Sequence, residues 1–197
     1  GQFRPLKSSR INRTERPVTH HIADIQCRFL SGSSSAAVDI DLSVIEKIKG
    51  MTHISDPHFA ERVRESFDRQ NVMHLIQATL PVVEHGRTEI HLPHWEGIEQ
   101  QHGFVHGGVV GTIADSAAGY AAMTVVPASA SVLTVEYKMN LVAPADGEKL
   151  IARGQVVRPG RTLIVTKAEV FAVKDGKETL CALMQQTIMV MHGKVEK

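Results

Sequence analysis

The sequence contains only two cysteines, Cys27 and Cys181, among its 197 residues. They lie far apart and outside any C-x-x-C or zinc-finger spacing, which excludes a disulfide scaffold and a cysteine-based zinc site. Sparse, unpatterned cysteine is typical of a reduced protein, and we therefore expect a cytoplasmic location.

An excess of charge of either sign is also missing. The 22 Lys and Arg residues nearly balance the 21 Asp and Glu residues, and the formal net charge is +1. This balance gives no reason to expect nucleic acid or an anionic membrane surface as a partner.

A long hydrophobic run without polar interruptions is absent as well. The most apolar window, residues 104–126, is long enough to span a bilayer, but it contains His106, Asp115 and four glycines. Ionisable residues are rare and costly inside membrane spans. We therefore predict that this window forms a buried helix and that the protein has no membrane partner.

Residues 1–50 differ in composition from the rest of the chain. They are rich in arginine and include the linker-like run SGSSSA at 31–36. An upstream or vector-derived extension, an organellar transit segment and an arm that docks on the core would each fit this composition. We favour an extension over 1–50 and a compact domain over 51–197, because Met51 stands where the composition changes.

An amphipathic helix is predicted soon after Met51. Phe59, Val63 and Phe67 recur four residues apart, which places them on one helical face. Asp56 is the expected N-cap, with Pro57 at the first helical position. Two short strands around a His85-Gly86 turn should follow.

After the buried helix come four segments in which apolar and polar residues alternate. In the first, Thr134 is expected on the polar face, opposite a row of apolar side chains formed by Leu133, Val135, Tyr137, Met139 and Leu141. Turn sequences join the segments, so we predict strands linked by hairpins. One helix followed by such strands indicates an α+β fold, with an antiparallel sheet wrapped around the helix.

The start of the buried helix, HGGVVGTIADS at residues 106–116, sets a single carboxylate in an apolar run. With the strand segments that follow, it resembles the hotdog-fold acyl-CoA thioesterases of the phenylacetate-pathway type over residues 59–191. The resemblance implies a bent antiparallel sheet around one long central helix. It also implies a homodimer or homotetramer that binds acyl-CoA between protomers and uses no metal or organic cofactor.

Asp115 matches the catalytic carboxylate of that family, which acts as a base on water or attacks the thioester carbonyl directly. A buried carboxylate held only by structural hydrogen bonds, with Ser116 or Thr112 nearby, is the alternative. Catalysis is favoured because Asp is a poor residue in a helix interior and no Lys or Arg lies within one turn of it.

Gly107 matches the backbone donor to the oxyanion. A glycine in the first helical turn exposes a free N–H where the helix dipole is positive. Gly107 and Gly108 could equally serve only to make the turn, and both roles can hold together. The resemblance gives His106 a supporting role in this loop.

Other site residues are assigned with an alternative beside each. Gln100 fits the position of an amide that orients water or the carbonyl, although Gln101 could take that place. Thr134 fits a hydroxyl that holds the attacking water, or is an ordinary solvated strand residue. His102 lies four residues before His106, but without a third ligand we expect no metal site.

Residues for substrate binding are expected on two loops. Arg158 and Arg161 flank the Pro159-Gly160 turn and would meet the CoA phosphates, or only keep an exposed hairpin soluble. Trp95 and Phe104 border the loop before the helix and would line the acyl pocket, or simply pack. A hotdog hydratase or dehydratase and a non-catalytic acyl-CoA binding module are the alternative functions.

Overall fold

The computed structural model describes residues 56–194, so the predicted extension over 1–50 lies outside the described residues. The boundary between the two expected domains stays a prediction. In chain order the described elements are α3 (Phe59–Asp68), α4 (Asn71–Leu75), β1 (Thr79–Glu84), β2 (Arg87–Pro93), the 3-10 turn η1 (Glu96–Ile98), α5 (Gly107–Met123), β3 (Ala130–Leu141), β4 (Lys149–Arg158), β5 (Leu163–Lys174) and β6 (Lys177–His192).

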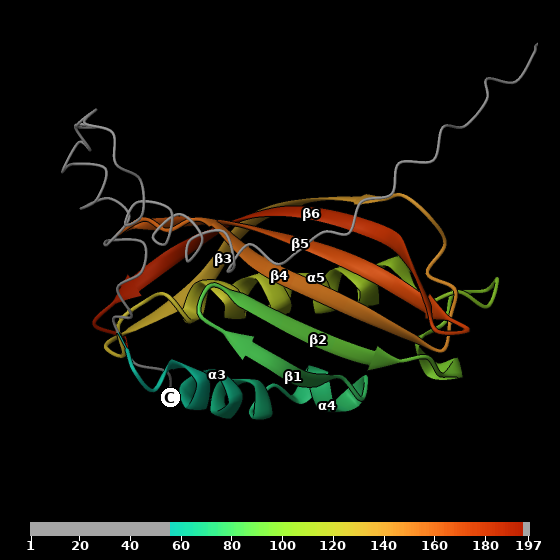
Figure 1. Cartoon of the computed structure of the whole chain (residues 1–197), viewed down its shortest axis with the longest axis horizontal. Coiled ribbons are helices and arrows are strands. Elements are labelled where there is room, and N and C mark those ends of the chain that lie inside the picture. Colours follow the sequence, from blue (N-terminus) through green and yellow to red (C-terminus); the bar gives the residue numbers. More distant parts are fainter. Residues whose placement is uncertain (1–55, 195–197) are drawn as a thin grey trace, which may run out of the picture. The chain divides into compact units, whose positions relative to one another are not determined.

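The six strands form one antiparallel sheet in the order β1-β2-β4-β5-β6-β3. The long helix α5 runs along one face of this sheet and contacts β2, β3, β4, β5 and β6 (Figure 1). The predicted α+β fold, an antiparallel sheet around one long helix, is therefore confirmed. Within residues 56–194, no helix is both long and apolar enough to cross a membrane.

Small residues bring α5 against the middle of the sheet. A Cβ added at Gly154 of β4 would overlap the carbonyl oxygen of Ala117 on α5. The buried Thr88 of β2 donates a hydrogen bond to the same carbonyl oxygen at 2.6 Å. The sheet backbone can approach the helix backbone this closely only because neither Gly154 nor Ala117 carries a bulky side chain.

The amphipathic helix α3 lies beside β1 and is tied to the end of α5 (Figure 1). Its N-terminus differs from the prediction, because the helix begins at Phe59 with His58 as its N-cap. The Asp56 carboxylate instead accepts from the His58 N–H and from Arg62 Nε, at 2.9 and 2.8 Å. Arg62 also donates to carbonyl oxygens at and beyond the C-terminal end of α5, those of Met123, Val126 and Ala130.

The strand β3 does not alternate as predicted. Thr134 pairs with Ile188 and Glu136 pairs with Thr187, so Val135 is an extra residue in a β-bulge. Before the bulge Thr134 contacts α5, whereas after it Tyr137 and Met139 approach Gly111 of that helix. The expectation that Thr134 lies on the outward, polar face was therefore wrong, because the bulge reverses the side-chain parity.

We expect Gly154→Ala to destabilise the fold. The new methyl group would overlap the Ala117 carbonyl oxygen, and forced overpacking costs about 1–3 kcal/mol in unfolding free energy. Urea or guanidinium unfolding measures this loss. Gly119→Ala on α5 is the control, since a Cβ there meets nothing within 4 Å and alanine favours helix. Equal stability of Gly154→Ala and the wild type would contradict the close approach.

Candidate active site

Asp115 lies at the middle of α5, half-buried, with its carboxylate turned toward the end of the sheet formed by β6 and β3. Its Oδ1 accepts a hydrogen bond from the Thr134 hydroxyl at 2.8 Å and another from the Gln186 amide. Gln186 Nε2 also contacts Thr134 Oγ1 at 2.9 Å. Thr134 therefore contacts Asp115 directly, and its suggested role in holding the attacking water stays a prediction. The Thr112 hydroxyl donates to the Gly108 carbonyl oxygen instead.

Gln186 is a site residue that the sequence analysis missed. It lies on β6 at a position whose neighbours on the same face, Met184 and Ile188, are buried and apolar. Thr166 of β5 is its direct cross-strand partner and donates to Gln186 Oε1 at 3.3 Å. The sequence does place a glutamine among the inward-facing apolar positions of this strand. Burying an amide costs free energy unless it is hydrogen-bonded, so such a glutamine indicates a buried polar partner.

A cavity of about 430 Å³ opens beside Asp115. The end of α3, the second half of α5 and β3 supply most of its wall, which is partly polar. Its lining residues are Ser66, Arg69, Gln70, Asp115, Ser116, Gly119, Tyr120, Met123, Val132, Leu133, Thr134 and Ile188. At the α3 side of the wall the hydroxyls of Ser66 and Tyr120 lie 3.3 Å apart.

The first turn of α5 presents a backbone donor. His106 is the N-cap in extended conformation, and its Nδ1 accepts from the Gly108 N–H at 2.9 Å. The His106 carbonyl oxygen accepts from Val109 and Val110. Within residues 56–194, the Gly107 N–H has no acceptor. His106 therefore closes the turn, and the Gly107 N–H is left at the positive end of a 17-residue helix.

The loop before α5 is braced within itself. Gln100 Oε1 accepts from the His102 N–H at 2.6 Å, and the Gln100 N–H donates to the Phe104 carbonyl oxygen at 2.8 Å. Gln101 is exposed. Trp95 is half-buried against the core, with its indole Nε1 3.4 Å from the Ile76 carbonyl oxygen. Gln100, Trp95 and Phe104 do not line the cavity beside Asp115 in the same chain.

The turn between β4 and β5 carries the two predicted arginines. Arg158, Gly160 and Arg161 are all exposed. A Cβ at Gly160 would overlap the Leu163 carbonyl oxygen, which explains the glycine there. Within the described part of the chain, neither guanidinium forms an ion pair with a carboxylate.

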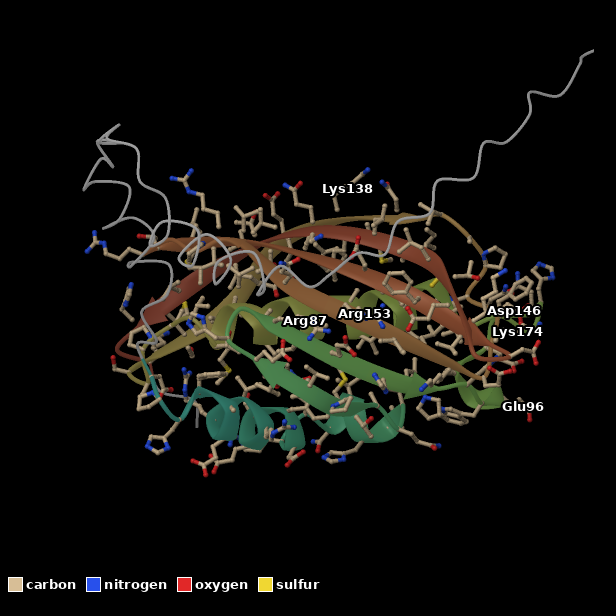
Figure 2. All side chains as sticks on the ribbon, viewed as in Figure 1. Arg87, Glu96, Lys138, Asp146, Arg153 and Lys174 are labelled. Atoms are coloured by element: carbon tan, nitrogen blue, oxygen red, sulfur yellow. The ribbon has the colours of Figure 1, made fainter. Side chains whose placement is uncertain are left out.

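A cluster of charged residues on the sheet, away from the cavity, is internally paired. Arg87 and Arg153 lie near each other over β2 and β4 (Figure 2), and both contact Glu89. Arg153 also forms two hydrogen bonds of 2.7 Å with Glu178, which lower the pKa of Glu178 and raise that of Arg153. Because these charges satisfy one another, the cluster offers no unpaired cation for an anionic ligand.

Cys181 does not fit the role of a nucleophile. Its side chain is buried, its Sγ donates to the Val170 carbonyl oxygen at 3.3 Å, and burial raises its pKa to about 11. Among residues 56–194, no group of three or more His, Cys, Asp or Glu side chains is arranged to hold a metal ion.

Comparison with known proteins identifies the family of this chain. The sequence profile of the thioesterase superfamily matches residues 102–179. A crystal structure of a thioesterase family protein from Silicibacter pomeroyi is 45% identical with a TM-score of 0.68, covering 68% of this chain and 99% of that one. A proposed esterase of Saccharolobus solfataricus is 36% identical over 95 residues, which are 48% of this chain and 66% of that protein.

The fold is also that of the E. coli PaaI protein from the phenylacetic acid degradation operon. The two structures match with a TM-score of 0.63 at 16% sequence identity, over 73% of this chain and 100% of that one. A long helix against an antiparallel sheet, with this likeness, defines a hotdog protein. The chain belongs to the thioesterase superfamily, a class of thioester hydrolases, and the resemblance inferred from its motif is confirmed.

We expect Cys181 to resist thiol reagents in the native protein. The thiolate is the reactive form, and a pKa of about 11 leaves almost none of it at pH 7–8. In a Cys27→Ser variant, Ellman's reagent should label the native chain slowly, and faster as the pH rises toward 11. The same protein in guanidinium should release one equivalent of dye at once. Rapid, stoichiometric labelling of the native variant at pH 7 would contradict this burial.

Proposed function

We propose that this protein hydrolyses acyl-CoA or aryl-CoA thioesters to a free acid and CoA without a metal or organic cofactor. The observation that carries the proposal is the carboxylate of Asp115, which is fixed by Thr134 and Gln186 and borders a cavity in a chain of the thioesterase superfamily. A carboxylate is the kind of group that can activate water or attack an acyl carbon.

The reaction begins at the thioester carbonyl. Asp115 takes a proton from water as the water oxygen bonds to the acyl carbon, and the carbonyl oxygen becomes an oxyanion. When the tetrahedral intermediate collapses, the carbon–sulfur bond breaks, and CoA leaves with the proton that Asp115 held. Asp115 could instead attack the carbon itself. The carbon–sulfur bond would then break, CoA would leave as a thiolate that takes a proton from water, and water would hydrolyse the resulting mixed anhydride.

Gly107 is the proposed donor to that oxyanion. Its N–H has no acceptor within residues 56–194 and lies at the start of α5. Preorganised backbone donors of this kind stabilise developing negative charge strongly. His106 supports the donor by capping the turn, while Gly108 lets the chain make it. The loop that contains Gln100, Gln101, Trp95 and Phe104 directly precedes this turn, and we assign it to the substrate side of the site.

We further propose that each site is shared between two protomers. Gly107 and Asp115 belong to one helix and are eight residues apart, about 12 Å along its axis and roughly 80° around it. Both must come within about 3 Å of one thioester group, which a single helix cannot arrange. A two-fold dimer solves this by bringing Gly107 of one chain to Asp115 of the other.

The edge of the sheet supports a dimer. The strand β3 is 12 residues long and ends the strand order. Four of its apolar side chains, Leu133, Val135, Tyr137 and Leu141, are between 49% and 57% exposed. A long apolar edge strand is a surface that proteins normally cover. A second copy of this chain is the proposed cover, in a homodimer or homotetramer.

The nucleotide end of the substrate is assigned to the β4–β5 turn. Arg158 and Arg161 are exposed there without carboxylate partners in the described part of the chain, and arginine suits phosphate through its planar set of donors. A cytoplasmic location, where CoA esters would be met, completes the proposal. A hydratase, the alternative enzyme, would require a histidine and an acid facing one substrate.

We expect Asp115→Asn to lower the turnover number of the wild-type enzyme by at least about 100-fold, because the general base is lost while the shape is kept. Thiol release is measured with acetyl-, hexanoyl-, palmitoyl-, benzoyl- and phenylacetyl-CoA. Binding of a CoA ester and the melting temperature should change little. Asp175→Asn, in the exposed β5–β6 turn, is the matched control. Hydrolysis by Asp115→Asn at the wild-type rate would remove Asp115 from the mechanism, and no hydrolysis of any ester by the wild type would favour the binding module.

We expect two inactive variants to complement each other. Gly107→Pro deletes the N–H at the first helical position, where proline is well tolerated, and the extended His106 before it suits proline. Gly107→Ala is the control, since it adds a Cβ 3.0 Å from Leu141 Cδ1 but keeps the N–H. Mixing Gly107→Pro with Asp115→Asn under subunit exchange should restore about half of the wild-type activity per heterodimer. Native mass spectrometry verifies the exchange, and inactive heterodimers of folded chains would place the site within one protomer.

A further inference from the structure

The two oxygens of the Asp115 carboxylate have different surroundings. Oδ1 accepts from both Thr134 and Gln186. Within residues 56–194, Oδ2 accepts no hydrogen bond, and it is also not among the side-chain atoms that are buried without a partner. Asp115 lines the cavity, so Oδ2 is the oxygen left open to it.

A hydrogen bond from Thr166 fixes the orientation of the Gln186 amide. Thr166 lies directly opposite Gln186 across the β5–β6 ladder, and its hydroxyl donates to Gln186 Oε1. The side chains of Thr166 and Gln186 are 0% and 1% exposed. A rotated amide would set its oxygen against the Asp115 carboxylate, and both oxygens would then be acceptors. The amide nitrogen must therefore face Asp115.

The donors form one directed chain that ends on Asp115. The Thr166 hydroxyl donates to Gln186, the Gln186 amide donates to Thr134 and to Asp115, and the Thr134 hydroxyl donates to Asp115 Oδ1. Every hydrogen in this chain has an acceptor, and the last acceptor is a carboxylate oxygen. Such a network holds the side chain in one rotamer, since rotation would break two hydrogen bonds at Oδ1 at once.

We propose that Gln186 is a positioning residue that holds Asp115 through Oδ1, so that Oδ2 is the oxygen that acts on water or on the thioester. The proposal rests on the function proposed above, in which Asp115 is catalytic. Gln186 contacts no substrate in this arrangement, because it lies behind the carboxylate and is fully buried. Thr166 acts indirectly, because it orients the amide of Gln186 and does not contact Asp115.

The test replaces Gln186 by methionine, which has a similar length and no donor. We expect the turnover number to fall about 10- to 100-fold, the scale that follows when a catalytic group is misplaced by about 1 Å. The KM for the most rapidly hydrolysed CoA ester should stay within about twofold, because Gln186 does not line the cavity. Gln185→Met is the matched control, since the adjacent side chain is exposed on the opposite face of β6.

A double-mutant cycle separates positioning from general damage. If Gln186 acts only through Asp115, adding Gln186→Met to Asp115→Asn should leave the residual rate unchanged. A further loss as large as that in the wild-type background would overturn the proposal. So would a Gln186→Met enzyme with a turnover number within twofold of wild type while Asp115→Asn is inactive, and that result would leave the proposed function intact. An active Asp115→Asn would overturn both.

Thr166 supplies a second variant if Gln186→Met lowers the melting temperature severely. Thr166→Val keeps the side-chain shape but removes the hydroxyl that orients Gln186, and Thr166→Ser keeps the hydroxyl. We expect Thr166→Val to lower the turnover number about tenfold with little change in KM, and Thr166→Ser to restore it. Equal turnover numbers for the valine, serine and wild-type enzymes would overturn the proposed chain.

Discussion

The contact between α5 and the middle of the sheet is the constraint on which the rest of this structure depends. Gly154 lets the β4 backbone reach the Ala117 carbonyl oxygen, and Thr88 hydrogen-bonds to the same atom from β2. Because the two backbones lie so close at this point, a larger residue than glycine at Gly154 would overlap the helix. The buried alanines of α5 suit this packing, and the helix gains its stability from burial on the sheet.

The same packing decides where Asp115 finds its partners. The Thr112 hydroxyl on α5 donates to the Gly108 carbonyl oxygen, and the donors to Asp115 come from the sheet that covers the helix. Thr134 on β3 and Gln186 on β6 supply them, and Thr166 on β5 holds Gln186 in place. The buried polar residues thus link three strands to one helical side chain. The geometry of the site is for this reason tied to the core of the domain.

Much of this arrangement could be predicted from sequence because its signals are local. The run from His106 to Asp115 contains both the glycine turn and the lone carboxylate. The periodicity of apolar residues predicted the helices and strands. The bulge at Val135 could not be predicted, since it depends on the register between β3 and β6. Without the bulge Thr134 was placed on the wrong face, and without the register Gln186 had no visible partner. The prediction of Asp56 as the N-cap was wrong for a similar reason, because its carboxylate pairs with Arg62.

Among the charged residues that the structure describes are a paired group on the sheet and an unpaired group at one turn. On β2 and β4 the arginines Arg87 and Arg153 are paired with Glu89 and Glu178, which stabilises the sheet surface without leaving a field that competes for anions. Arg158 and Arg161, at the far end of β4, carry charge that no carboxylate in the described chain neutralises. This difference is the reason for assigning the CoA phosphates to the β4–β5 turn in the proposed function. The carboxylate of Asp115 stays half-buried beside its cavity, where paired donors rather than a cation hold it. In the proposed mechanism, two neutral donors fix the carboxylate without the counter-charge that a neighbouring cation would bring.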